Sequence, residues 1–540
     1  MAQTVKVRTG GRLVAETLEA LGARVAFGVP GIHALSIWDG LRTSSVRTIG
    51  LRTELNAGFA ADGYARTSGC PAVLLLSTGP GALVSLAALM EAASAHVPVL
   101  AVASQIPSDL IGRGRGYLHE LADQLASFAP VVKWAARAET DAEIPERLAE
   151  AWRRALTPPP GPVFVEIPVD LLAGETDASP AKESSVVRTE PARVPADALT
   201  EAAALLNEAT RPAVWAGGGV LRSDAWHELA ELARRLDAPV ATTYMGKGAF
   251  PADDPLSAGS GCDEGAFKEL LEDADVVLAV GTELGAETTA QYNLRFSGRL
   301  IQIDAAPERI GSTYPALSLV GDARSMLVEL LPHVNERAAD GARRAAAVRD
   351  RIAQGLDEQD RALESSLLET IRAAVPRDAV TAWDMTILAY WAAAHFPVTA
   401  PRTFHYPLGS GTLGYAWPAA LGAAVARPGA PALAVVGDGG FLYGAQELAA
   451  ARQYGLDVVV LVVDDGGYGI LREYQRDSFG ETTAVDLEEP DFAALAESFG
   501  VPAERTTPEE LGGALGRAFE HGGPALVHLP LLVKMWTPTA

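Results

Sequence analysis

The sequence predicts an α/β protein made of three doubly wound parallel-sheet domains. Short runs of Val, Ile, Leu and Ala, which suit burial on both faces of a sheet, alternate with segments that have the spacing of amphipathic helices. The clearest runs lie within residues 71–81, 275–283 and 457–465. This alternation indicates parallel strands joined by helical crossovers. A length of 540 residues is enough for about three such domains.

Two changes in composition divide the chain. Residues 174–198 are polar, contain proline and lack an apolar period, which is typical of a linker. Residues 336–366 are charged and rich in alanine with helical spacing, which indicates a helical connector. The predicted domains are therefore residues 1–180, 190–335 and 365–540.

Each domain contributes predicted strands that end in turn-forming or polar residues. They lie within residues 23–31, 71–81 and 97–105 of the first domain, 212–219, 275–283 and 299–307 of the second, and 431–440 and 457–465 of the third. The segment 71–104 is apolar enough to suggest a membrane span, but a Gly-Pro-Gly turn interrupts it and Glu91 and His96 lie inside it. It is therefore predicted to fold as strand, turn, helix and strand.

The composition excludes several classes of partner. The formal net charge is -24, with 44 Lys and Arg against 68 Asp and Glu, whereas nucleic acids and anionic membranes are bound by clustered basic residues. We therefore expect no nucleic-acid and no membrane partner. Cys70 and Cys262 are too few for a disulfide framework or a zinc site, and the N-terminal residues lack the apolar core of a secretory signal. These features predict a cytoplasmic location.

The first and third domains contain a weak internal repeat. Residues 58–104 and 414–465 both follow the order helix, Gly/Pro loop, strand, Gly-rich turn, helix, strand. The two domains could be copies of one unit. The alternative is that all α/β units look alike at this level.

Two predicted strands of the third domain end in carboxylates. Asp438 and Asp465 each follow an apolar run and lie one strand–helix–strand unit apart. Adjacent parallel strands would bring them together at the carboxyl edge of the sheet, where such proteins bind ligands. Two close carboxylates need a cation, and oxygen ligands suit Mg²⁺ or Ca²⁺. Because Gly439 and Gly440 open the next predicted helix, whose N–H groups favour an anion, the pattern suggests a diphosphate held through Mg²⁺.

The GDGGF motif at 437–441, followed by the acidic pair at 464–465, resembles the cofactor motif of thiamine diphosphate-dependent enzymes of the acetolactate synthase and 2-oxo acid decarboxylase (pyruvate decarboxylase-like) group. Further motifs fall where that family has its own, so the resemblance covers nearly the whole chain. They are GVPG (28–31), RTELNAGFAADGYAR (52–66), STGPGA (77–82), GRGRGYLHELADQ (112–124), GSGTLGYAWPAALGAA (409–424) and YGILREYQ (468–475). The resemblance implies that the first domain binds the pyrimidine of the cofactor and that the third binds its diphosphate.

The resemblance also implies the metal ligands. Asp438 would be the first, Asp465 the second, and the carbonyl group of Gly467 the third, and together they would hold Mg²⁺. The chain departs from the family pattern because Asp464 and Asp465 stand where two asparagines are usual. The departure adds a negative charge beside the diphosphate.

Other residues would contact the cofactor if the resemblance holds. Glu54 would pair with the pyrimidine ring and activate the cofactor, the Gly411 carbonyl would contact the ring amino group, and Leu413 would bend the cofactor. Taken together, the implied cofactor-binding residues are Glu54, Thr386, Gly411, Leu413, Asp438, Gly439, Gly440, Tyr468 and Gly469. Without the resemblance, a helix-start charge or a capping residue is the preferred explanation for Glu54. The alternative for Leu413 is an ordinary core leucine.

Glu54 and Asp438 belong to different domains. In the family, the pyrimidine-binding domain of one subunit faces the diphosphate-binding domain of another. The resemblance therefore implies a homo-oligomer that is at least a dimer, and the choice between dimer and tetramer stays open.

His119 and Glu120 are further candidates for catalysis. A histidine beside the reacting centre could transfer a proton or orient the carboxylate of a 2-oxo acid. The alternative for His119 is a surface or satisfied core histidine. Arg113 and Arg115 could attract a carboxylate substrate, but interface or solvent positions are the preferred explanation.

The central domain carries three glycines, 217–219, after a predicted strand. Its counterparts in true acetolactate synthases bind FAD, but residues 281–291 lack the arginine-containing pattern of that site. FAD is therefore not expected, and the domain is predicted to be mainly structural.

The leading functional hypothesis is a lyase or transferase that decarboxylates a 2-oxo acid and transfers the acyl-anion equivalent to a second carbonyl, as acetolactate synthases do. The alternative is a simple decarboxylase that releases an aldehyde. A non-catalytic partner subunit is a further alternative, which Glu54, Leu413 and Asp438 together argue against. An NAD(P)-type dehydrogenase is disfavoured because no GxGxxG motif is followed by an acidic residue at the required spacing. The sequence does not identify the substrate side chain.

Overall fold

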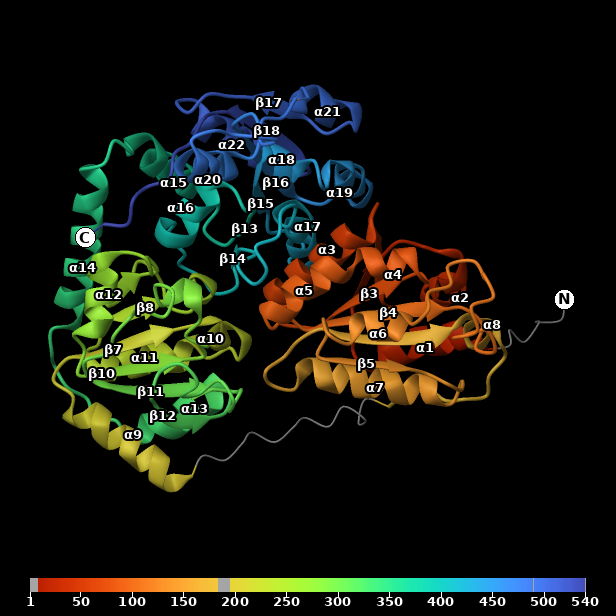
Figure 1. The fold of residues 1–540 in the computed structure, drawn as a ribbon, viewed down its shortest axis with the longest axis horizontal. Coiled ribbons are helices and arrows are strands. Elements are labelled where there is room, and N and C mark those ends of the chain that lie inside the picture. The colour runs from red at the N-terminus through yellow and green to blue at the C-terminus, as the bar shows by residue number, and fades with distance from the viewer. Residues whose placement is uncertain (1–7, 183–194, 489, 540) are drawn as a thin grey trace.

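The computed structural model describes residues 8–182, 195–488 and 490–539. These residues form three six-stranded sheets, and every strand pair in them is parallel. The predicted fold class, three α/β units with parallel sheets, is thereby confirmed. In Figure 1 the first unit is red to orange, the second is yellow to green and the third is teal to blue. No helix in the described part of the chain is long and apolar enough to span a membrane.

The first sheet has the strand order β2-β1-β3-β4-β6-β5. Its strands are β1 (Val25–Gly28), β2 (Arg47–Gly50), β3 (Ala72–Leu76), β4 (Val99–Gln105), β5 (Trp134–Arg137) and β6 (Val163–Pro168). The helices around it are α1 (Gly10–Ala20), η1 (Ile32–Ala34), α2 (Leu35–Leu41), α3 (Glu54–Ser68), α4 (Pro80–Val84), α5 (Leu86–Ser94), α6 (Gln124–Phe128), α7 (Glu143–Leu156) and α8 (Val169–Ala173). β3 and β4 are buried along their whole length, as expected for central strands covered on both faces.

The second sheet has the order β12-β11-β10-β7-β8-β9. Its strands are β7 (Pro212–Ala216), β8 (Val240–Thr242), β9 (Ser257–Gly259), β10 (Val276–Val280), β11 (Arg299–Asp304) and β12 (Leu317–Val320). Its helices are α9 (Ala196–Glu208), α10 (Gly218–Arg222), α11 (Trp226–Leu236), η3 (Tyr244–Gly246), α12 (Gly265–Glu272), η4 (Ala286–Thr288), α13 (Ala323–Leu330) and η5 (Leu331–His333).

The third sheet has the order β14-β13-β15-β16-β18-β17. Its strands are β13 (Val380–Trp383), β14 (Phe404–His405), β15 (Ala432–Gly437), β16 (Val458–Asp464), β17 (Ala503–Arg505) and β18 (Ala525–Pro530). Its helices are α15 (Ala362–Ala374), α16 (Ile387–His395), α17 (Ala416–Ala426), α18 (Asp438–Phe441), η6 (Ala445–Glu447), α19 (Leu448–Tyr454), α20 (Gly469–Phe479), α21 (Phe492–Ser498) and α22 (Leu511–Glu520).

The first and third sheets share one topology. Numbered from its own first strand, each sheet has the order 2-1-3-4-6-5, whereas the second sheet has the order 6-5-4-1-2-3. The shared order agrees with the internal repeat predicted from residues 58–104 and 414–465.

The segments between the sheets agree only in part with the prediction. The middle of the predicted linker, residues 183–194, lies outside the described residues, and its last residues belong to α9. The predicted helical connector corresponds to α14 (Gly341–Asp357), which runs along the outer edge of the molecule in Figure 1. We keep residues 1–180, 190–335 and 365–540 as proposed domain limits, although α15 begins slightly before the third of them.

The first and third domains pack together through α3 and α17. Two glycines allow the helices to meet backbone to backbone. A Cβ atom at Gly63 would lie 2.1 Å from the carbonyl oxygen of Ala419, and a Cβ atom at Gly422 would lie 1.9 Å from that of Ala60. Both distances are far inside van der Waals contact, so only glycine permits this approach.

Candidate active site at the carboxyl ends of the strands

The predicted pair of carboxylates meets at the edge of the third sheet. β15 and β16 are adjacent and parallel, with Gly437 opposite Val463, so Asp438 and Asp465 follow neighbouring strand ends. Among the described residues, both carboxylate oxygens of Asp438 and one carboxylate oxygen of Asp465 are buried without a hydrogen-bond partner.

Both carboxyl groups have raised pKa values. Burial raises the pKa of Asp438 to about 6, and the nearby N–H groups of Gly439 and Gly467 oppose this only in part. Burial raises the pKa of Asp465 to about 7, with repulsion from Asp438 as the next cause and Arg472 opposing it. Unpartnered, mutually repelling carboxylates of this kind fit a divalent cation.

The two aspartates line a cavity of about 220 Å³. It also brings together most of the predicted cofactor-binding residues, which are Thr386, Gly411, Leu413, Gly439, Gly440, Tyr468 and Gly469, as well as the predicted ligand Gly467. Every residue that lines this cavity belongs to the third domain, and Glu54 is not among them.

Glycines make room for the polar groups of this cavity. A Cβ atom at Gly469 would lie 1.9 Å from a carboxylate oxygen of Asp465, and one at Gly439 would lie 2.6 Å from the ring of Tyr468. Gly467 has a φ of 148° and leaves no space for a side chain beside the carbonyl of Val485. The predicted helix behind Gly439 is only the single turn α18, so isolated N–H groups, and not a long helix dipole, would face an anion.

Asp464 is turned away from the cavity. One of its carboxylate oxygens lies 2.7 Å from Nε2 of His528, and the other accepts a hydrogen bond from the backbone N–H of Gly466. Asp464 is also absent from the residues that line the cavity. Of the two consecutive aspartates, Asp465 therefore lines the cavity and Asp464 does not, because consecutive residues at a strand end point in opposite directions.

Asp384 has a structural role in the site that sequence reasoning missed. It follows β13 and accepts hydrogen bonds from the backbone N–H groups of Met385 (2.8 Å), Gly414 (3.1 Å) and Ala416 (3.3 Å). Burial raises its pKa to about 6. Asp384 thereby fixes two cavity-lining loops, and its place at a strand end was the available signal.

Arg472 holds one wall of the site in place through its hydrogen bonds. It donates hydrogen bonds to the carbonyl oxygen of Gly466 and to Asp486, each at 2.8 Å, and it lies 3.8 Å from a carboxylate oxygen of Asp465. The guanidinium group therefore holds the loop that follows β16 and partly compensates Asp465.

Glu54 lies in a separate cluster on the first domain. It is the first residue of α3 and is half-buried, and burial raises the pKa of its carboxyl group. Gly81 packs against it, since a Cβ atom there would lie 2.7 Å from Oε1 of Glu54. A raised pKa suits a carboxyl group that has to share a proton.

His119 has a histidine partner that sequence reasoning missed. The rings of His33 and His119 lie edge to face with centroids 5.3 Å apart, and Nδ1 of each ring is buried without a described hydrogen-bond partner. Burial and the charge of His119 lower the pKa of His33. The backbone of His119 also packs on Gly79. The only signal was the position of His33 two residues after the GVPG motif.

Glu120 forms hydrogen bonds within its own loop. Its carboxylate accepts hydrogen bonds from the backbone N–H groups of Arg115 (3.2 Å), Gly116 (2.6 Å) and Tyr117 (3.0 Å), and it thereby closes its own loop. These bonds lower the pKa of Glu120. These contacts indicate a structural role for Glu120, and its catalytic role stays a prediction. Arg113 and Arg115 are exposed.

The glycine triplet of the central domain has a packing role. A Cβ atom at Gly217 would lie 2.3 Å from the carbonyl oxygen of Gly281, and one at Gly219 would lie 2.6 Å from its Cα atom. The turns after β7 and β10 therefore touch through their backbones.

In the described residues there is no cluster of three or more His, Cys, Asp or Glu side chains suited to a metal. The Asp438–Asp465 site differs from such a cluster, because it would combine two carboxylates with a backbone carbonyl.

Comparisons with known proteins agree with this geometry. Three family descriptions match the chain: the N-terminal thiamine pyrophosphate (TPP) binding domain of thiamine pyrophosphate enzymes at residues 8–127, their central domain at 199–330, and their C-terminal TPP binding domain at 384–529.

Relatives are similar along almost their whole length. A probable 2-ketoarginine decarboxylase, AruI, from Pseudomonas aeruginosa is 39% identical over 98% of this chain and 95% of its own. A probable acetolactate synthase large subunit from Methanocaldococcus jannaschii is 34% identical over 96% and 91%. The acetolactate synthase isozyme 2 large subunit of Escherichia coli is 30% identical over 98% and 96%. The chain therefore belongs to the family of thiamine pyrophosphate-dependent enzymes that includes acetolactate synthases and 2-oxo acid decarboxylases.

Proposed function

We propose that this enzyme decarboxylates a 2-oxo acid with thiamine diphosphate and Mg²⁺ as cofactors. The observation that carries the proposal is the pair of buried, unpartnered carboxylates of Asp438 and Asp465 at the mouth of a glycine-lined cavity. These two side chains and the Gly467 carbonyl would hold the metal, which would in turn hold the diphosphate. When bound, thiamine diphosphate supplies an electron sink that makes cleavage beside a carbonyl group feasible.

Residues around the cavity would bind and orient the cofactor. Leu413 would support its rings, the Gly411 carbonyl would accept from its amino group, and Thr386 and the glycines at 439, 440 and 469 would surround its diphosphate beside Tyr468. Asp384 would keep these loops in place through its backbone hydrogen bonds.

Glu54 would complete the site from a second subunit. It does not line the cavity of its own chain, so we propose a homo-oligomer that is at least a dimer, in which Glu54 of one protomer holds a proton at the pyrimidine bound by its partner. Exposed apolar side chains on both domains support such an interface, among them Val84, Met90, Leu442 and Tyr443.

For the fate of the acyl-anion equivalent, we favour protonation and release of an aldehyde. Two facing imidazoles, His33 and His119, are suited to hold and transfer a proton, and the relative with 39% identity is named a decarboxylase. Transfer to a second carbonyl, as in acetolactate synthases, is the second candidate, and the names of the other relatives support it.

A 2-oxo acid with a cationic side chain is our preferred substrate. Tyr390 lines the cavity, and its pKa is raised to about 12 by burial and by the nearby groups Tyr474 and Glu287. The carboxylate of Glu287 acts on Tyr390 and would favour a cationic substrate. This agrees with the name of the 2-ketoarginine decarboxylase. With two free cysteines we also propose that the enzyme acts in the cytoplasm.

The test is a set of 2-oxo acids that includes pyruvate and 2-ketoarginine, assayed with thiamine diphosphate and Mg²⁺. Release of CO₂ together with an aldehyde is the expected result. Formation of a 2-hydroxy ketone or 2-hydroxy acid would favour carboligation over this fate. No CO₂ release from any acid, together with no stabilisation by the cofactor, would favour a non-catalytic partner subunit.

A further inference from the structure

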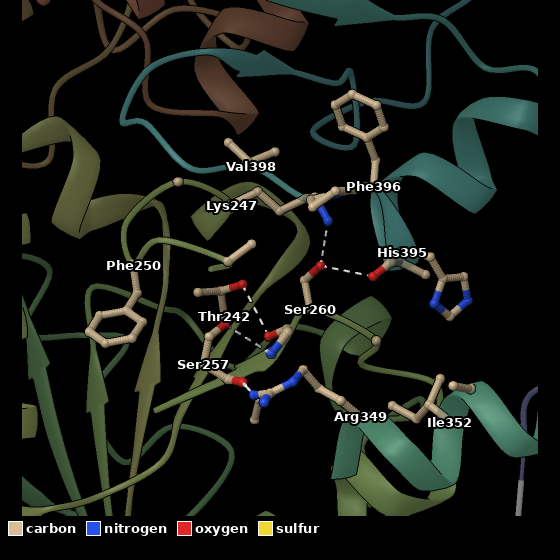
Figure 2. Close-up of a pocket in the computed structure, with 18 of the residues that line it drawn as sticks. Thr242, Lys247, Phe250, Ser257, Ser260, Arg349, Ile352, His395, Phe396 and Val398 are labelled. Atoms are coloured by element: carbon tan, nitrogen blue, oxygen red, sulfur yellow. Dashed lines mark hydrogen bonds between the residues drawn. The ribbon is translucent and has the colours of Figure 1, made fainter. Parts of the chain in front are cut away.

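A second cavity lies between the central domain, the connector α14 and the end of α16, and its volume is about 270 Å³ (Figure 2). It is distinct from the cavity that Asp438 and Asp465 line, called the cofactor cavity below, because no residue lines both. Helix α16 joins them, since Ile387 at its start lines the cofactor cavity and His395 at its end lines the second cavity.

The ionisable side chains that line this cavity are all basic. Lys247, Arg349 and His395 line it, and no Asp or Glu does, although the chain has a net charge of -24. Nε2 of His395 lies 3.4 Å from a carboxylate oxygen of Glu264, so a charge on this ring would have a partner. Neither Lys247 nor Arg349 forms an ion pair with a residue that the structure describes.

Lys247 is almost completely buried, with 6% of its surface exposed. Its Nζ atom donates a hydrogen bond to Oγ of Ser260 at 2.6 Å, and the ring of Phe404 lies 5.4 Å away. An ammonium group has three donors, and within the described part of the chain this is its one hydrogen bond. Figure 2 shows the Lys247 side chain reaching toward Ser260 in the middle of the cavity.

A purely structural role does not account for a lysine here. Oγ of Ser260 lies 3.1 Å and 3.0 Å from the carbonyl oxygens of Ala393 and Ala394, so the hydroxyl group alone can hold the end of α16. A buried cation without a counter-charge is costly. Burial lowers the pKa of Lys247 to about 7, against a weak opposing effect of the Cys262 thiol, as expected for an ammonium group that lacks an anion.

Apolar side chains make up much of the remaining wall, and they include Phe250, Ile352, Leu356, Phe396 and Val398. Thr242, Ser257 and Ser260 add hydroxyl groups. At about 30 Å³ for each water-sized group, the cavity has space for about nine such groups. We propose that it binds a small monocarboxylate, whose carboxylate pairs with Lys247 and Arg349 and whose short apolar chain packs against these walls. A single carboxylate matches this lining better than a polyanion, because the polar groups are few and the apolar area is large.

The test measures binding of hexanoate to the enzyme loaded with thiamine diphosphate and Mg²⁺, by isothermal titration calorimetry. Hexanoate cannot be decarboxylated as a 2-oxo acid, so the result does not depend on the proposed reaction. We expect hexanoate to bind, 1-hexanol to bind at least tenfold more weakly, and Lys247→Met to raise the Kd for hexanoate at least tenfold. Lys268→Met, on the nearby helix α12, is the matched control and should leave the Kd unchanged.

A second variant guards against misfolding of Lys247→Met. Ala353 lies on the exposed side of α14 at the edge of the cavity, so Ala353→Trp should fill the cavity, retain both cations and abolish hexanoate binding. The proposal is overturned if wild-type enzyme does not bind hexanoate, if Ala353→Trp binds it normally, or if a 2-oxo acid substrate displaces it competitively. The last outcome would assign hexanoate to the cofactor cavity.

Discussion

One carboxylate oxygen of Glu91 accepts two hydrogen bonds from Ser410, one from its backbone N–H and one from its hydroxyl, each at 2.7 Å. The other oxygen accepts a hydrogen bond from Arg66 at 2.8 Å. Glu91 is fully buried in the first domain, whereas Ser410 directly precedes Gly411 in the cofactor cavity of the third. A buried carboxylate of one domain thus fixes a loop that lines the candidate cofactor cavity of another.

Replacing this carboxylate should weaken both stability and cofactor binding. Glu91→Ala leaves buried donors on Arg66 and Ser410 unsatisfied, and each such loss costs about 1–3 kcal/mol. We expect urea denaturation to report a loss in this range and the Kd for thiamine diphosphate to rise. Glu150→Ala, which removes a partly exposed ion-pair carboxylate on α7, is the control, and an equal effect there would contradict the assignment.

Glu54→Gln should keep most of the cofactor affinity and lose most of the turnover. The amide retains the size of the side chain but cannot hold the proton that the carboxyl group shares, and such groups contribute about 100-fold or more to the rate. The measurements are kcat for CO₂ release and the Kd for thiamine diphosphate. Glu143→Gln changes a glutamate at the start of α7 and should behave as wild type. Wild-type kcat in Glu54→Gln would remove Glu54 from the mechanism.

Asp438→Ala should lose the affinity for thiamine diphosphate that depends on Mg²⁺. Without this ligand, we expect the Kd to rise at least tenfold in the presence of Mg²⁺, because a direct carboxylate–metal contact is lost. Fluorescence titration with and without EDTA measures the effect. Asp457→Ala, just before β16 and outside the cavity, is the matched control. Equal Kd values in the Asp438 variant and wild type would locate the metal elsewhere.

His33→Asn should lower kcat more than it raises KM, since the proposed role of the histidine pair is proton transfer and not substrate binding. We expect His119→Asn to act in the same direction and the double variant to be little worse than either single one, because the two rings act as one unit. Steady-state kinetics with aldehyde detection provide the test. Additive losses would indicate independent roles.

Acid should destabilise the protein through His405. Burial, and then the charge of Arg66, lower the pKa of His405 to about 3, and its Nε2 lies 2.7 Å from the hydroxyl of Thr67. Between the unfolded value near 6.5 and this folded value, the unfolded state binds the proton and the folded state does not. The free energy of unfolding should therefore fall as the pH falls from 6.5 toward 3.

Urea denaturation at several pH values measures this dependence. His405→Gln should show a shallower loss of stability than wild type over that range, whereas the exposed His227→Gln on α11 should follow wild type. Parallel curves for wild type and His405→Gln would show that other groups cause the acid sensitivity.

The sequence was sufficient to predict the features that depend on the order of residues along a short segment. Apolar runs such as those of β3 and β16 predict buried parallel strands, and the placement of Asp438 and Asp465 after consecutive runs predicts that they meet. The sequence was insufficient to predict the role of a residue where that role depends on the direction of its side chain. Nothing in two consecutive aspartates tells which of them faces the cavity, and nothing in the loop at 115–120 tells that Glu120 binds its own backbone.

Contacts between distant segments were also out of reach. The pairing of His33 with His119 joins loops from different strand ends, and the cation-lined cavity at Lys247 is assembled from two domains and α14. Each of these side chains alone is consistent with an ordinary surface or core position, so only their three-dimensional arrangement gives them a candidate role.

The contact of α3 with α17 has a consequence for how the enzyme moves. Helices that touch through their peptide groups at Gly63 and Gly422 cannot slide or tilt without collision, so we expect the first and third domains of a protomer to move together. Access for substrate and exit for product then depend on smaller breathing motions of the surrounding loops. Cross-linking these two helices should therefore leave the catalytic cycle intact.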